Sequence, residues 1–399
     1  MPAPGVDEFL EVPQGRVHLL RHPVRPRDTL RAWDAADEYV LEHLAQSPQA
    51  ERLAQPGAEV VVVNDESGAV TAALAVAYPA CSLTHVGDSL VSQLALRANL
   101  ARNGVDSHRV TALSGHDEWP SDIAIAVVKV PKALALLDEQ LRRLRGHLLP
   151  DAVVVGAAMT RHVHLSTIEC FERHIGPTPT SLAQRKARLL LAEVGAAQPA
   201  AVSPWPVQWQ VPATGLTVVG YANAFGAEAI DPGTAFLLEH LDASLPGATV
   251  VDIGCGTGVL GLTIALGNPD VQVVCIDESF DAVASTSASW EATCSQHGLG
   301  HRAGQVVCRV GDGLPAAITA RGSVDRVVMN PPFHIGHALS DATAWDWFVQ
   351  ARHALRSGGD VWVVGNRHLA YHVKLKRVFG NCTVVAGNPN FVVLRSERG

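Results

Sequence analysis

Short, unbroken apolar runs rich in valine recur along the whole chain and alternate with longer segments rich in alanine and leucine. Such runs occur at VVVV (60–63), AIAVV (124–128), AVVVG (152–156), TVVDIG (249–254), VQVVCID (271–277), DRVVMN (325–330) and DVWVVGN (360–366). Continuous apolar runs are typical of strands that are buried on both faces of a parallel sheet, with helices between them. The chain is therefore predicted to have an α/β fold built from doubly wound parallel sheets.

A proline-rich segment, GAAQPAAVSPWPVQW at residues 195–209, separates these runs into two groups. Its prolines and small residues break both helical and strand periodicity, as an interdomain linker does. A chain of 399 residues is also too long for a single hydrophobic core. We therefore predict one domain over residues 1–194, a linker over 195–209 and a second domain over 210–399.

The composition limits the possible functions. The net charge is -8, so any contact with nucleic acid must come from local basic patches. The seven cysteines are scattered and form no CxxC pair, which predicts neither a disulfide framework nor a metal site. The N-terminus, MPAPGVDEFLEV, lacks the basic start and apolar run of a signal peptide, and no apolar stretch reaches membrane-spanning length. A cytoplasmic protein is predicted.

The segment VDIGCGTGVLG (251–261) follows one predicted strand and opens a predicted helix. Glycines 254, 256 and 258 allow a tight turn and close approach of a ligand to the backbone, while the helix N-terminus offers free N–H groups. Asp252 lies at the end of the strand before the turn. Asp277 closes the next strand, where a carboxylate can accept hydrogen bonds from both ribose hydroxyls. On their own, the turn also fits a dinucleotide-binding oxidoreductase and Asp277 also fits a helix N-cap.

The motif NPPF (330–333) ends a third predicted strand. Its two prolines fix the backbone so that the carbonyls of Asn330 and Pro331 have no competing N–H donors. A guanine N2 amine is a weak nucleophile, because its lone pair is delocalised into the ring, and its two hydrogens must be held by acceptors. The Asn330 side-chain oxygen and the Pro331 carbonyl supply these acceptors, and Phe333 can stack on a flipped base. Pro-Pro at a strand end is alternatively a simple stop signal.

The two predicted domains match each other segment by segment, which favours a duplication. VVVNDESGAVTAAL (61–74) aligns with VVDIGCGTGVLGL (250–262), with Gly68 against Gly256, and VVKVPK (127–132) aligns with VMNPPF (328–333). In this alignment Glu66 and Val70 replace Gly254 and Gly258, while Lys129 and Lys132 stand at the first and last positions of NPPF. The first domain is therefore predicted to have lost the cofactor site and to bind RNA phosphates through Lys129 and Lys132.

Taken together, these segments resemble the S-adenosylmethionine-dependent ribosomal RNA (guanine-N2)-methyltransferase family. The likeness is carried by VDIGCGTGVLGL, NPPFHIGHALSDATAW and VVGNRHLAYHVKLKRVFGNCTVV, and it extends into residues 32–44, 86–100 and 127–145. It is closer to the large-subunit enzyme than to its small-subunit relative. The resemblance implies two Rossmann-like methyltransferase domains in tandem, the N-terminal one degenerate.

The resemblance also implies roles for individual residues. The cofactor S-adenosylmethionine is expected to contact Asp252, Gly254, Gly256, Gly258, Asp277, Asp312 and Asn330, and the target base is expected to contact Asn330, Pro331 and Phe333. The family usually has Phe-Ser where this chain has Phe225 and Gly226, which leaves no side-chain role at position 226. Phe225, Asp231 and Thr234 are expected to cover the cofactor.

Basic residues gather in a few places on this acidic chain. NRHLAYHVKLKR (366–377) contains Arg367 and Lys374, and RRLR (142–145) and RKAR (185–188) are similar. One such stretch is typical of a solvated helix face, but several suggest a dipolar surface that can bind phosphates. Arg367, Lys374 and His334 are predicted to contact substrate. His334 and His337 form HxxH without a third ligand at useful spacing, so a solvated histidine remains the alternative to RNA contact.

The predicted function is transfer of a methyl group from S-adenosylmethionine to the N2 amine of a guanine in ribosomal RNA, in the large subunit. Four alternatives stay open: a small-subunit guanine-N2 enzyme, an adenine-N6 or protein glutamine amide methyltransferase, a dinucleotide-dependent oxidoreductase, and a non-catalytic RNA-binding factor. The expected partner is ribosomal RNA or a ribosomal subunit assembly intermediate, and the expected form is a monomer away from any membrane.

Overall fold

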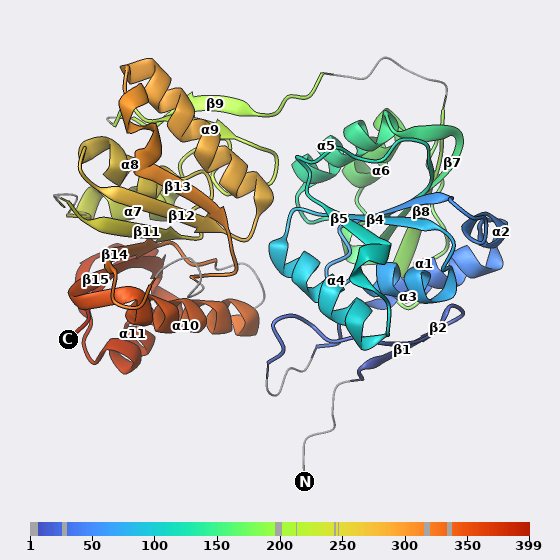
Figure 1. Cartoon of the computed structure of the whole chain (residues 1–399), viewed down its shortest axis with the longest axis horizontal. Coiled ribbons are helices and arrows are strands. Elements are labelled where there is room, and N and C mark those ends of the chain that lie inside the picture. Colours follow the sequence, from blue (N-terminus) through green and yellow to red (C-terminus); the bar gives the residue numbers. More distant parts are fainter. Residues whose placement is uncertain are drawn as a thin grey trace, which may run out of the picture. The chain divides into compact units, whose positions relative to one another are not determined.

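The structure is a computed structural model (Figure 1), and it describes residues 7–25, 30–195, 202–212, 214–242, 245, 247–314, 320–332 and 337–399. The chain divides into two compact units, Met1–Ser203 and Pro204–Gly399, and each is described by itself. Residues 196–201 of the segment predicted to be a linker lie outside the described residues. Within the described ranges, no helix is long and apolar enough to cross a membrane.

The first unit is built on a six-stranded sheet with the strand order β5-β4-β3-β6-β7-β8. Its strands are β3 (Glu59–Val63), β4 (Ser82–Val86), β5 (Val110–Leu113), β6 (Ile123–Lys129), β7 (Leu148–Met159) and β8 (Ala187–Glu193). Its helices are α1 (Ala35–Gln46), α2 (Gln49–Leu53), α3 (Ala69–Ala77), α4 (Leu90–Arg102), α5 (Leu134–Arg145) and α6 (Leu165–His174). Apolar residues of α1, α3 and α4 pack on one face of the sheet, and those of α5 and α6 pack on the other.

The second unit is built on a seven-stranded sheet with the strand order β13-β12-β11-β14-β15-β17-β16. Its strands are β11 (Thr249–Ile253), β12 (Gln272–Asp277), β13 (Val306–Val310), β14 (Val324–Met329), β15 (Leu355–Asn366), β16 (Thr383–Gly387) and β17 (Phe391–Glu397). Its helices are α7 (Pro232–His240), α8 (Val259–Gly267), α9 (Phe280–His297), α10 (His337–Ala354) and α11 (Tyr371–Phe379). The helices α7, α8 and α9 cover one face, and α10 and α11 cover the other.

The predicted fold class is confirmed, because both units are doubly wound α/β domains in tandem. In each unit the first five strands follow the order 3-2-1-4-5 and pair in parallel. The valine runs form the sheet core, and Val60, Val61 and Val250 are fully buried. This explains why their apolar character is continuous rather than alternating.

The prediction of purely parallel sheets is wrong at the edges. Strand β8 pairs antiparallel with β7, and β17 pairs antiparallel with both β15 and β16. Two short hairpins were also not predicted, and they are formed by β1 (Phe9–Val12) with β2 (Gly15–His18) and by β9 (Val207–Gln210) with β10 (Thr217–Gly220). Four-residue strands carry too little pattern to be recognised in a sequence. Strand β9 begins inside the segment predicted to be a linker.

The turn after the first strand corrects the alignment of the two units by two positions. Val63 ends β3 and pairs with β6, just as Ile253 ends β11 and pairs with β14. In both units the helix that follows, α3 or α8, begins six positions after this residue. Gly68 and Gly258 both act as N-caps with positive φ, 73° and 83° respectively. Gly68 therefore corresponds to Gly258 rather than to Gly256. Glu66 takes the place of Gly256, and Val70 is a buried residue of α3 instead of a loop residue.

Candidate active site

The glycine-rich turn between β11 and α8 lies at the carboxyl edge of the second sheet. The N–H of Gly256 donates to the Asp277 Oδ2 at 2.9 Å, and the N–H of Thr257 donates to the Phe225 carbonyl at 3.1 Å. Gly256 has a φ of 55°, and a Cβ built there would lie 2.7 Å from the Phe225 carbonyl oxygen. The turn is thus held between the end of β12 and the segment around Phe225, and no side chain fits at its centre.

Two of the predicted cofactor carboxylates lie at this same edge. Asp277 ends β12, and its Oδ1 also accepts the N–H of Ser279 at 3.0 Å. Burial raises the pKa of Asp277 above its usual range. Asp312 follows β13, whose last residue, Val310, pairs with Asp277. Asp277 and Asp312 therefore lie at the ends of two adjacent strands, near the glycine turn, and their contact with the adenosine part of S-adenosylmethionine stays a prediction.

Asp252 lies below this turn and is 1% exposed. Its Oδ2 accepts the N–H of Gly261 at 2.9 Å, which ties the strand to the first turn of α8. Within the described part of the chain its Oδ1 has no hydrogen-bond partner, and burial raises the pKa of Asp252 to about 7. These interactions give Asp252 a role in shaping the turn, and its contact with the cofactor stays a prediction.

Asn330 follows β14 and lines a cleft that it shares with the glycine turn. The cleft is also lined by Phe225, Ile230, Thr257 and Leu260. The Asn330 Nδ2 donates to the Asp231 Oδ2 at 2.9 Å and to the Thr234 Oγ1 at 3.0 Å. The Asn330 Oδ1 is buried and has no hydrogen-bond partner among the residues that the structure describes. Asn330 therefore keeps a free acceptor at the place where the sequence predicts the target amine.

The structure describes only part of the NPPF motif. Pro331 is buried and Pro332 is half-buried, but Phe333 and His334 lie outside the described residues. The sequence did not single out Thr286, whose hydroxyl donates to the Gly256 carbonyl at 2.9 Å. It also missed the contact of Asp231 and Thr234 with Asn330. The pair Asp231-Pro232 is a recognisable helix start, but no local sequence pattern links it to Asn330, which is distant in the chain.

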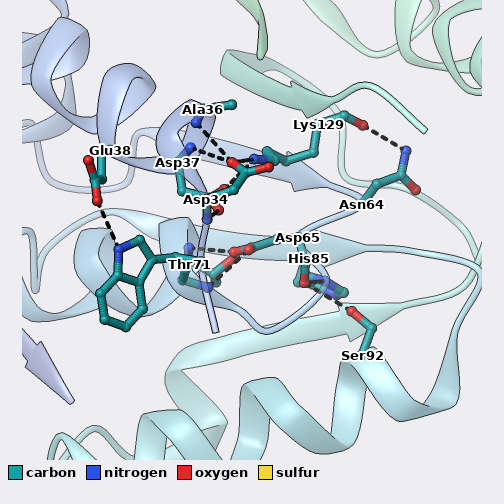
Figure 2. A network of polar contacts seen from close by, with 12 residues as sticks. Asp34, Ala36, Asp37, Glu38, Asn64, Asp65, Thr71, His85, Ser92 and Lys129 are labelled. Carbon is teal, nitrogen blue, oxygen red and sulfur yellow. Dashed lines mark hydrogen bonds and ion pairs between the residues drawn. The ribbon is translucent and has the colours of Figure 1, made fainter. Parts of the chain in front are cut away.

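Lys129 occupies the position of Asn330 in the first unit (Figure 2). Val128 pairs with Val63 as Met329 pairs with Ile253, so the next residue is Lys129 in one unit and Asn330 in the other. The Lys129 Nζ lies 3.1 Å from the Asp34 Oδ1 and 2.5 Å from the Asp37 Oδ1, and its side chain is only 14% exposed. The prediction that Lys129 contacts an RNA phosphate is wrong, because its charge is buried and satisfied inside the protein.

The charges of this cluster are strongly coupled. Burial alone would lower the pKa of Lys129, but the carboxylates of Asp37 and Asp34 raise it above its usual range. Burial is also the main reason that the pKa of Asp37 rises to about 7, and the nearby charge of Asp34 adds to this rise. One ammonium thus serves two carboxylates, which we call the Lys129 ion cluster (Lys129, Asp34 and Asp37).

The turn after β3 in the first unit is held by the unit's own polar groups (Figure 2). The Asp65 Oδ2 accepts the N–H and the hydroxyl of Thr71, both at 2.8 Å. Thr71 corresponds to Gly261, so the carboxylate of Asp65 replaces that of Asp252 at the helix start. The Asn64 Nδ2 donates to the Lys129 carbonyl at 3.1 Å. The contact of Asp65 with Thr71 thus resembles the contact of Asp252 with Gly261 in the second unit, and both fix the start of a helix.

Replacing Lys129 tests this view of the first unit. Lys129→Asn removes the buried ammonium and leaves two carboxylates unpaired, so we expect a loss of about 3–5 kcal/mol in unfolding free energy. The double variant Lys129→Asn/Asp37→Thr recreates the Asn330, Asp231 and Thr234 arrangement of the second unit. It should regain much of the lost stability in urea unfolding. Parental stability of the single variant would contradict a stabilising ion cluster.

The remaining predicted substrate residues lie at different places. Lys132 is exposed in the loop after β6. Arg367 begins a 3-10 helix directly after β15, the neighbour of β14, and its guanidinium donates to the Asn388 carbonyl at 3.0 Å. Lys374 lies on α11, with its ammonium 5.1 Å from the Tyr371 ring centroid. Arg367 therefore shares the carboxyl edge of the sheet with Asn330.

Comparison with known proteins gives consistent matches for both units. Residues 7–196 match the RLMG N-terminal domain, and residues 215–395 match the methyltransferase small domain. The chain is 47% identical over 390 residues to ribosomal RNA large subunit methyltransferase G of Streptomyces griseus, covering 96% of this chain and 98% of that protein. It is 44% identical over 386 residues to the protein of the same name from Pseudomonas aeruginosa PAO1, covering 97% and 98%.

A solved structure shares the whole two-unit fold. It is the T. thermophilus 16S rRNA N2 G1207 methyltransferase in complex with AdoMet and guanosine, and it superimposes with a TM-score of 0.71 at 20% identity. The match covers 98% of this chain and 97% of that one. At 20% sequence identity, this structural likeness establishes the fold alone.

Proposed function

This chain belongs to the ribosomal RNA large subunit methyltransferase G family, and on that basis we propose that it methylates the exocyclic N2 amine of a guanine in large-subunit ribosomal RNA. It is an S-adenosylmethionine-dependent enzyme of the methyltransferase small-domain type. The resemblance inferred from its motifs is confirmed by relatives that match it over nearly their full length.

The observation that carries this proposal is the unpartnered Asn330 Oδ1. Both hydrogens of the Asn330 amide are already donated to Asp231 and Thr234, so the free oxygen can only accept. An exocyclic amine presents hydrogens to such an acceptor, and holding them orients the nitrogen lone pair toward the methyl donor. A side-chain base is not required, because the amine loses its extra proton readily once it has been methylated.

The glycine turn and the two carboxylates near it support the proposed methyl transfer. The glycine turn, Asp277 and Asp312 would hold S-adenosylmethionine at the edge of the sheet where Asn330 lies. When bound, S-adenosylmethionine supplies an electrophilic methyl group on a positively charged sulfur. The protein itself contributes orientation, because it holds the amine in place. Because the proposed substrate is ribosomal RNA, we propose that the enzyme acts in the cytoplasm.

We propose that the first unit binds RNA through Lys132, which was predicted, together with Arg161 and His164, which were not. Lys132, Arg161 and His164 are exposed near the carboxyl edge of its sheet. Burial lowers the pKa of His162, and the positive charges of Arg161, Lys132 and His164 lower it further, so these groups lie close together. Positive side chains gathered in this way suit the phosphate backbone of RNA.

Salt-titrated RNA binding tests this surface. Removing one cation that binds a phosphate should reduce the slope of log affinity against log salt by about one unit, so Lys132→Ala/Arg161→Ala should reduce it by about two. Arg97→Ala, an exposed cation on α4, serves as the control and should leave the slope unchanged. If the double variant kept the parental slope and affinity, the first unit would act only as a structural brace.

The choice of RNA can be tested with the full-length protein. Purified chain, labelled S-adenosylmethionine and ribosomal RNA from a strain lacking this enzyme should give label in the large-subunit RNA. Small-subunit RNA from the same preparation is the internal control. Label confined to the small-subunit RNA would contradict the proposed substrate.

A further inference from the structure

The direction of the Asn330 amide is set by its partners. A side-chain amide can turn over and exchange its oxygen and nitrogen, and the two forms differ only in their hydrogen bonds. The Asp231 carboxylate accepts and cannot donate, so it holds the Nδ2 at 2.9 Å and excludes the turned form. The Thr234 hydroxyl accepts the second Nδ2 hydrogen at 3.0 Å. Among the described residues, the Oδ1 is left without a hydrogen-bond partner.

Asp231 is itself fixed by the helix that follows it. It is the N-cap of α7, and its Oδ2 accepts the N–H of Thr234 at 2.9 Å. Pro232 stands at the first helical position, where its fixed φ favours the helix start. The carboxylate that orients Asn330 is therefore anchored to backbone, and it does not depend on a mobile side chain.

We infer that Asp231 and Thr234 are positioning residues, which hold the Asn330 oxygen toward the target amine and act through Asn330 alone. This role differs from the expectation that they cover the cofactor, which stays a prediction. The inference rests on the proposed function, because it assumes that Asn330 accepts a hydrogen bond from the base being methylated.

The first unit supports this inference independently (Figure 2). Asp34 is the N-cap of α1, as Asp231 is of α7, and Asp37 lies three residues later, as Thr234 does. Both contact Lys129, which occupies the position of Asn330. In both units, the N-cap and the third residue of the helix thus contact the residue at the carboxyl end of the equivalent strand, β6 or β14. In the first unit the ammonium of Lys129 stands in place of the Asn330 amide, and the carboxylate of Asp37 stands in place of the Thr234 hydroxyl.

Two substitutions test the inference in the full-length enzyme. Asp231→Asn can still cap α7, but its amide lets Asn330 turn over, so kcat on large-subunit ribosomal RNA should fall about tenfold or more. Thr234→Val keeps the shape and loses one acceptor, and kcat should fall by a factor of about three. Thr234→Ser returns the hydroxyl and should recover most of that loss. The dissociation constant of S-adenosylmethionine should not change in any of them.

A double-mutant cycle separates positioning from a general effect on the helix. If Asp231 acts only through Asn330, adding Asp231→Asn to Asn330→Ala should cause no further loss of kcat. Ser89→Ala removes the N-cap hydrogen bond of α4 in the first unit and serves as the control for cap loss, with parental kcat expected.

Two results would overturn the inference. One is parental kcat in both Asp231→Asn and Thr234→Val while Asn330→Ala is impaired, and the other is full additivity of Asp231→Asn with Asn330→Ala. Either would leave the proposed function standing. Parental activity of Asn330→Ala itself would instead show that the proposed function has the wrong acceptor.

Discussion

Gly256→Glu is expected to abolish S-adenosylmethionine binding while the second unit stays folded. The residue has a φ of 55°, and even a Cβ would lie 2.7 Å from the Phe225 carbonyl oxygen. A glutamate there would also bring a negative charge beside the buried carboxylate of Asp277, whose Oδ2 accepts the Gly256 N–H. The first unit has Glu66 at the corresponding place. Titration calorimetry with S-adenosylmethionine should show binding to the parent and no measurable heat for the variant.

A matched control separates the cofactor site from backbone strain. Gly298 has a φ of 65°, and a Cβ there would meet nothing within 4 Å. Gly298→Glu carries the same change of side chain and a similar strain at the end of α9, so it should bind the cofactor as the parent does. Parental affinity in Gly256→Glu would show that the cofactor does not lie at this turn.

Asn330→Ala is expected to lower the methylation rate on the order of a hundredfold or more, since removing one orienting hydrogen bond commonly raises a barrier by about 2–4 kcal/mol. The side chain is hydrogen-bonded to Asp231 and Thr234 and does not belong to the glycine turn, so the affinity for S-adenosylmethionine should change little. Single-turnover methylation of large-subunit ribosomal RNA and calorimetry on the same preparation measure the two quantities. Equal rates in parent and variant would refute the role of Asn330.

The sequence was sufficient for the parts of the molecule that depend on local pattern. Continuous valine runs identified the buried parallel strands, since burial on both faces removes the usual alternation. Asp277 ends β12, while Asp312 and Asn330 follow β13 and β14. These strands and β11 are adjacent and parallel, and the carboxyl ends of parallel strands meet at one edge of the sheet. Their gathering at that edge therefore follows from the predicted topology.

The prediction for Lys129 was wrong because it depends on contacts between segments that are distant in the chain. The ion cluster joins Lys129 to Asp34 and Asp37, almost a hundred residues earlier in the chain, and no periodicity reports such a pairing. A lysine at a strand end looks like a surface cation until its partners are known. Similarly, a glycine-poor turn offers few fixed points for alignment, so Gly68 was matched two positions away from its structural equivalent, Gly258.

The identity of the methylated atom tests the central claim most directly. Full-length enzyme, isotopically labelled S-adenosylmethionine and large-subunit ribosomal RNA from a strain lacking the enzyme are incubated, and the RNA is digested to nucleosides for mass spectrometry. Asn330→Ala serves as the control for enzyme-dependent label. We predict label in N2-methylguanosine and its near absence with the variant. Label in N6-methyladenosine instead, or no labelled nucleoside at all, would contradict the proposed reaction.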